Sequence, residues 1–144
     1  MSVSAADVFR FIADPRNKLA VLGSTASTGP QTALVGIAVT SDLALIFDTV
    51  KSSRKYPNLA ADARCSFVIG LGGRGGITVQ YQGEVREVTG AAELDRLKQI
   101  YFAVFADGPS RESWPGIAYF MVKPAWIRYN DYGGTPPVIE EFTF

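Results

Sequence analysis

The chain contains no histidine among its 144 residues. This absence excludes catalytic triads and dyads that rely on an imidazole base, and it excludes zinc sites with histidine ligands. Any chemistry must therefore come from carboxylates, tyrosine, lysine and arginine, or from a bound cofactor. The carboxylates are scattered along the chain, and no pair has a spacing that indicates acid–base catalysis.

Cysteine is nearly absent as well. The single cysteine, Cys65, excludes an intramolecular disulfide and any Cys-x-x-Cys motif. It lies in the strand-like run "RCSFVIG", so we expect it to be a small buried core residue rather than a reactive thiol.

Net charge and long apolar runs are also lacking. Fourteen Lys and Arg balance fourteen Asp and Glu, so no overall field indicates a nucleic acid or an anionic membrane as partner. No apolar run approaches the roughly 18 residues of a membrane span. The segment "MSVSAADVFRF" has no basic region followed by an apolar core, so we expect no signal peptide and a cytoplasmic protein.

The composition that remains is ordinary for a globular protein, and its apolar pattern predicts mainly β structure. Ser4 and Asp7 form a capping-box pair that opens a short helix ending at Asp14. Further helices are expected over 56–62 and 91–106. The tail 133–144 is rich in proline and glycine, and we expect it to be loop or extended chain. Strands are expected over residues 18–28, 32–41, 43–50, 63–70, 77–88 and 118–132.

Six consecutive antiparallel strands with short turns favour a closed or nearly closed barrel, because closure removes unpaired strand edges. No repeat, linker or shift in composition divides the chain, so residues 1–144 are expected to form one domain. A barrel of this size has little interior room. A large flat ligand would therefore lie outside it, between subunits.

The segment "FDTVKSSRKYPNL", residues 47–59, follows an apolar strand and gathers polar groups that suit an anion. Thr49, Ser53, Arg54 and Lys55 supply two hydroxyls, a guanidinium and an ammonium, which are the donors that phosphate recognition requires. From chemistry alone the segment is either a phosphate site or an exposed loop.

Two other features are open to more than one interpretation. The glycine-rich run 70–76 leads into a strand rather than a helix, which favours a hairpin connection over a phosphate loop, with a lid as the alternative. The aromatic residues of 119–132 suit a core, a surface that stacks on a planar ligand, or a dimer interface.

The order of these residues resembles the flavin-binding split-barrel superfamily, the pyridoxamine 5′-phosphate oxidase-like proteins. In that family the segment runs aromatic-x-Thr, then Ser-Arg/Lys-Lys after three residues, and here the match is Phe47 to Thr49 and Ser53 to Lys55. The element order agrees over nearly the whole chain, including "NLAADARCSFVIG" and the strand "VQYQGEVREV" before a helix. The resemblance implies a six-stranded antiparallel split β-barrel with a few flanking helices.

The resemblance also implies a cofactor and a partner. The family binds FMN between the subunits of a homodimer, with the phosphate on Thr49, Ser53, Arg54 and Lys55. Its second strand, here residues 33–37 and centred on Val35 and Gly36, lies along the isoalloxazine through its backbone. Asp48 would flank the ribityl chain. No metal ligand is implied.

The implied activity is that of a flavin-dependent oxidoreductase, with hydride transfer at flavin N5. The true oxidases carry an Arg and a Lys at the positions of Ala33 and Ala38, and a Gln at the position of Thr78. They also have a C-terminal Arg-x-His motif, which this chain lacks because it has no histidine. We therefore expect a family member that does not oxidise pyridoxamine phosphate. A reductase that uses an 8-hydroxy-5-deazaflavin coenzyme and a non-catalytic flavin-binding dimer are the alternatives. The catalytic residues stay unknown, although Tyr81, Tyr129 or a water could donate a proton.

Overall fold

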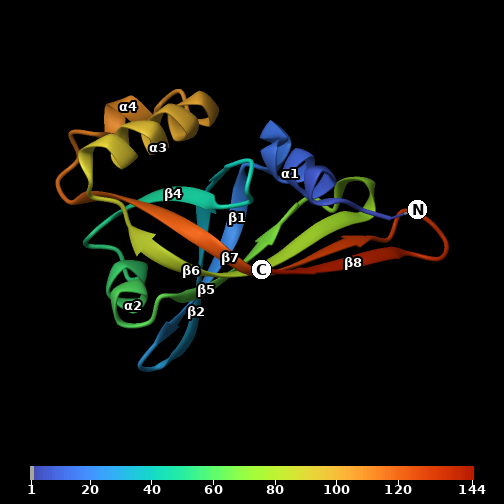
Figure 1. Ribbon diagram of the computed structural model, residues 1–144. Coiled ribbons are helices and arrows are strands. Elements are labelled where there is room, and N and C mark those ends of the chain that lie inside the picture. Colours follow the sequence, from blue (N-terminus) through green and yellow to red (C-terminus); the bar gives the residue numbers. More distant parts are fainter. Residues whose placement is uncertain (1) are drawn as a thin grey trace.

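The computed structural model describes residues 2–144, apart from the side chain of Arg74, and shows an antiparallel sheet with helices packed around it (Figure 1). Its strands are β1 (Leu19–Ala26), β2 (Gly29–Gly36), β3 (Ala38–Val39), β4 (Leu45–Val50), β5 (Arg64–Ile69), β6 (Ile77–Glu87), β7 (Ile117–Asp131) and β8 (Val138–Thr143). Its helices are α1 (Ala5–Ala13), α2 (Lys55–Ala61), α3 (Ala91–Val104) and α4 (Gly108–Arg111), with 3₁₀ turns η1 (Pro15–Asn17) and η2 (Arg74–Gly76).

The sheet curls because of its strand order, which is β2-β1-β5-β6-β7-β4-β3 with β8 paired to β7. β2 and β3 stand at opposite ends of this order, yet only Ile37 separates them along the chain. The two ends of the sheet must therefore approach each other. This confirms the prediction of a mainly β, antiparallel fold with a few helices, and the sheet takes the form of a curled half-barrel.

The predicted number of strands was wrong, since the described residues form eight strands and not six. The strand expected over 32–41 is interrupted at Ile37, where the chain leaves its pairing with β1 and begins to pair with β4. The tail expected as loop or extended chain contains β8, which pairs with β7 along Val138–Thr143. Local sequence does not show where a strand changes partner, nor that a short tail segment will find one.

The sheet has a core on each face of β4, because successive side chains of a strand point to opposite faces. Phe47 points into the curl, where its ring stacks on Phe120 at 5.1 Å. Ile46 points outward into a second cluster, which α3 covers with Leu97 and Tyr101. Helix α1 packs on the inner core with Val8 and Ile12. These two cores hold β4 and its C-terminal turn in place.

Several local predictions are confirmed. The capping box at the start of α1 is formed by Ser4 and Asp7. The strand expected over 118–132 is β7, and its register with β6 shifts near Pro124, which lies opposite Gly83 while Trp126 lies opposite Gln82. The helix expected over 91–106 is α3, which covers the sheet with its buried residues Leu97 and Tyr101. Within residues 2–144, no helix has both the length and the apolar character that crossing a membrane requires.

Candidate functional site

The predicted phosphate segment forms a tight turn between β4 and α2. Thr49 is the last buried residue of β4, and its hydroxyl donates to the Ser53 hydroxyl at 3.1 Å. The Ser53 N–H donates to the Val50 carbonyl at 3.0 Å, which closes the turn. Arg54 and Lys55 follow directly, at the start of α2. The structure therefore brings all four predicted phosphate residues, Thr49, Ser53, Arg54 and Lys55, into one turn, the hydroxyl–cation turn.

A cavity of about 210 Å³ lies between this turn and the β1–β2 hairpin. Among the residues that the structure describes, its lining contains two cations and no carboxylate: Leu22, Ser24, Gln31, Thr32, Ala33, Arg54 and Lys55. Its volume is below the roughly 300–1,000 Å³ of pockets that enclose a whole ligand. The cavity therefore suits the anionic end of a ligand, with the remainder outside.

The two cations of this cavity lack carboxylate partners within residues 2–144. By contrast, Lys51 at the other end of the turn lies 4.0 Å from a Glu87 carboxylate oxygen. Burial lowers the pKa of the Lys55 ammonium, and the negative charge of Asp48 opposes this shift only in part. A partly buried ammonium without a counterion is the charge that a bound phosphate would neutralise.

Asn58 fixes the position of the turn against the hairpin, and the sequence analysis did not find this residue. Its side-chain amide donates to Gln31 Oε1 at 2.9 Å and to the Ser24 hydroxyl at 3.3 Å. Both acceptors line the cavity. Its spacing could have indicated it, because Asn58 is four residues after Arg54 and therefore lies on the same side of a helix.

β2 borders the cavity through Gln31, Thr32 and Ala33, and the register decides which backbone groups of the strand bond to β1. Ile37 donates its N–H to the Lys18 carbonyl at 2.7 Å, so the odd-numbered residues of this stretch bond to β1. Val35, predicted to contact the flavin, therefore directs its backbone groups to β1, and its side chain is buried in the core. Leu34 and Gly36 direct theirs to the opposite edge, which has no strand partner within residues 2–144.

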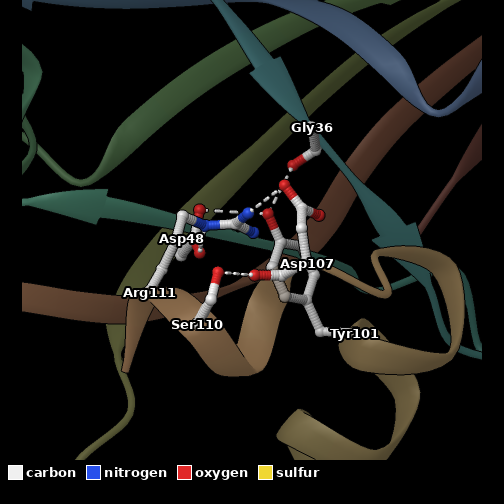
Figure 2. Close-up of polar contacts among 6 residues, drawn as sticks. All are labelled: Gly36, Asp48, Tyr101, Asp107, Ser110 and Arg111. Atoms are coloured by element: carbon white, nitrogen blue, oxygen red, sulfur yellow. Dashed lines mark hydrogen bonds and ion pairs between the residues drawn. The ribbon is translucent and has the colours of Figure 1, made fainter. Parts of the chain in front are cut away.

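Asp48 and Thr49, predicted to act together, point to opposite faces of β4. The Asp48 carboxylate accepts from Arg111 Nε at 3.0 Å and from the Tyr101 hydroxyl at 3.1 Å (Figure 2). Arg111 also donates to Asp107 Oδ2 at 2.8 Å, within the same cluster. The structure therefore directs the Asp48 carboxylate to α3 and α4, on the face of β4 opposite the Thr49 hydroxyl, although its charge still acts on Lys55. Strand alternation is the reason.

The two tyrosines considered as proton donors lie in the inner core. The Tyr81 hydroxyl donates to the Leu43 carbonyl at 2.7 Å, and its ring is almost fully buried. Tyr129 packs edge-on against Phe11 with ring centroids 6.0 Å apart. Burial raises the pKa of both phenols. Neither hydroxyl lies in the lining of the cavity described above.

Similar folds occur among solved structures. A heme-binding protein from Mycobacterium smegmatis has a TM-score of 0.79 and 19% identity, over 99% of this chain and 59% of that one. The chain thus spans less than two thirds of that protein. A putative pyridoxamine 5′-phosphate oxidase from Listeria innocua has a TM-score of 0.71 and 16% identity, over 87% and 96% of the two chains.

A third structure is a pyridoxamine 5′-phosphate oxidase-related, FMN-binding protein from Nostoc punctiforme, with a TM-score of 0.67 and 10% identity over 95% of this chain and 94% of that one. At these identities the likeness shows a shared fold and not a shared function. No curated protein matches the sequence.

A match to a family model shows which family the sequence belongs to. The family model described as pyridoxamine 5′-phosphate oxidase matches residues 8–131, which run from the middle of α1 to the last residue of β7. These residues include the hydroxyl–cation turn, the β2 edge and the cluster around Asp48. With so much of its length matched, the chain belongs to the pyridoxamine 5′-phosphate oxidase family.

Proposed function

We propose that the protein is a cytoplasmic homodimer of one flavin-binding domain, residues 1–144, which binds FMN and acts as an oxidoreductase on a small substrate. The proposal rests mainly on the cavity beside α2. Its lining includes the positively charged side chains of Arg54 and Lys55 and, among the described residues, no carboxylate. Family membership supports the same ligand, because one relative of this fold is described as binding FMN.

The donors around the cavity fit the phosphate of FMN. Arg54 offers a guanidinium fork and Lys55 a partly desolvated ammonium, and the linked hydroxyls of Thr49 and Ser53 lie in the same turn. Charge-assisted hydrogen bonds contribute roughly 1.5–3 kcal/mol each. Two such bonds suffice to make the phosphate the main anchor of the ligand.

The rest of the ligand would extend from the cavity along the free edge of β2. Leu34 directs its N–H and carbonyl to this edge and Gly36 directs its N–H there, which leaves donors and an acceptor for the polar rim of a flavin ring, while the Gly36 carbonyl is bonded to Tyr101. Asp48 lies on the opposite side of β4, so we propose that it supports this edge and acts on the ribityl chain only from a distance.

When bound, FMN would supply hydride transfer at its N5 atom, and the protein would supply binding, orientation and exclusion of water. The residues assigned to binding are Arg54, Lys55 and the β2 edge. None of the tyrosines or carboxylates described above is assigned the role of acid or base.

The outer face of the sheet supports the homodimer. The paired strands place six outward side chains in a single row across the sheet: Leu34, Val21, Val68, Gln80, Arg128 and Glu141. Leu34 is 59% exposed and Val68 is 43% exposed, and they lie on the two strands that flank Val21 of β1, so the exposed apolar side chains of this row are grouped at one end of it. The Nε of Arg128 is buried and lacks a hydrogen-bond partner within residues 2–144. A second copy would cover the apolar half of this row.

The test is the identity of the ligand that the protein retains. The absorbance spectrum of the purified protein is recorded, any ligand released by heat is identified by chromatography, and the stripped protein is titrated with FMN, with the deazaflavin coenzyme and with haem. Retention or uptake of FMN at one per chain supports the proposal. Selective uptake of the deazaflavin or of haem would identify that molecule as the cofactor in place of FMN. If the protein binds none of the three, the cofactor assignment is wrong.

A further inference from the structure

The peptide group that joins Gly36 to Ile37 is held at both of its ends. Its carbonyl accepts from the Tyr101 hydroxyl at 3.3 Å, and its N–H donates to the Lys18 carbonyl at 2.7 Å. Among the described residues, the other edge groups of β2 have no strand partner on that side. The last residue of β2 is therefore fixed by a side chain that comes from α3, 65 residues away in the sequence.

The Tyr101 hydroxyl is itself oriented by charged groups. Its single hydrogen is shared between the Gly36 carbonyl and Asp48 Oδ1, which lies 3.1 Å away, and Arg111 holds the other carboxylate oxygen at 3.0 Å (Figure 2). The side chains of Asp48 and Arg111 are only 13% and 14% exposed. Arg111 is held in turn by Asp107 at 2.8 Å. A continuous chain of polar contacts thus links the Gly36 carbonyl to α4.

Packing also fixes the position of α3 over Gly36. A Cβ atom at this residue would lie 2.5 Å from the Phe105 ring, so the ring occupies space that only glycine leaves free. The rings of Phe105 and Tyr101 are 4.8 Å apart. The hydroxyl of Tyr101 and the ring of Phe105 therefore hold the same residue of β2 by two different interactions.

We propose that Tyr101 is a positioning residue for the flavin, acting through Gly36 without touching the ligand. The N–H and C=O of a strand residue point to the same side. By holding the Gly36 carbonyl, Tyr101 also fixes the direction of the Gly36 N–H along the edge where the flavin ring would lie. This inference rests on the proposed binding of FMN, and it assigns the Asp48–Arg111 pair the role of orienting Tyr101.

The closely matched control is Tyr119, which lies in the same cluster beneath α3. Its hydroxyl is buried and has no hydrogen-bond partner among the described residues. Tyr101→Phe and Tyr119→Phe therefore remove the same atom from the same layer, but only the first removes a bond to β2. A general effect of losing a hydroxyl from this layer appears in both variants.

The experiment compares the two variants in three measurements: the FMN dissociation constant, the midpoint potential of the bound flavin, and the amide resonance of Ile37 in the protein without ligand. Tyr101→Phe is expected to weaken FMN binding about 3- to 10-fold, the loss of one hydrogen bond. It should also move the potential and the Ile37 resonance. Tyr119→Phe should change the dissociation constant by less than about twofold and leave the other two unchanged.

Two outcomes would contradict the inference, and they differ. A wild-type protein that does not bind FMN overturns the proposed function and this inference with it. A wild-type protein that binds FMN, with Tyr101→Phe equal to Tyr119→Phe in all three measurements, overturns the inference alone. If Tyr101→Phe does not fold, Arg111→Lys replaces it: this variant loosens Asp48 and should shift the Ile37 resonance, and an unshifted resonance counts against the role of Tyr101.

Discussion

Replacing Lys55 with Met tests the phosphate site at its most buried charge. Methionine keeps most of the length of the lysine side chain and removes the ammonium, so the turn between β4 and α2 should keep its shape. The expected result is weaker FMN binding without loss of folding. The change also removes a charge that burial disfavours, because the pKa of Lys55 is lowered mainly by desolvation.

The magnitude follows from the environment of the ammonium. Lys55 lines the cavity beside Arg54, has no ion-pair partner among the described residues, and would therefore make a charge-assisted bond to a phosphate oxygen. Such a bond contributes roughly 1.5–3 kcal/mol, which corresponds to one to two orders of magnitude in the dissociation constant. Arg54 remains in the variant, so binding should be weakened and not abolished.

The assay is a fluorescence titration of FMN with the wild-type protein, Lys55→Met and the control Lys51→Met. Lys51 is exposed, lies near Glu87 and is outside the cavity lining, so its replacement should change the dissociation constant by less than about twofold. The melting temperature of Lys55→Met without ligand should not fall. Equal affinities of Lys55→Met and the wild-type protein would refute the role of the turn in phosphate binding.

Three further predictions concern other parts of the molecule. Leu34→Glu, on the exposed row of the sheet, should convert a dimer into a species of 15.5 kDa by light scattering, and a wild-type protein already at that mass would contradict the dimer. Asp48→Asn should lower the free energy of unfolding by about 2 kcal/mol in a denaturant titration, because Arg111 loses a largely buried charge partner; an unchanged unfolding midpoint would argue against this. Cys65 should react with a thiol reagent at pH 8 only after unfolding, since burial raises its pKa to about 12, and rapid labelling of the folded protein would contradict that environment.

Most of the strands and the hydroxyl–cation turn could be predicted because their signals are local. Alternation of apolar residues marks most of the strands, and the four polar residues from Thr49 to Lys55 follow one another along seven positions. A turn of this kind is formed by neighbouring residues, so its sequence is enough to bring its donors together. The family resemblance added the order of the elements and the flavin.

The surroundings of that turn could not be predicted, because they depend on pairing between distant segments. The bond of Asn58 to Gln31 spans 27 residues, and the ion pair of Arg111 with Asp48 spans 63. Only the strand register shows that Val35 directs its backbone to β1 while Gly36 faces the free edge. A shift of one residue would exchange these roles, and sequence patterns locate strand boundaries less precisely than that.

The central claim is that the cavity beside Arg54 and Lys55 holds the phosphate of FMN. The most direct test compares the affinity of the wild-type protein for FMN and for riboflavin, which carries the same ring and ribityl chain without the phosphate. Two charge-assisted bonds predict that FMN binds at least about 100-fold more tightly than riboflavin. Equal affinities for the two ligands would contradict the claim.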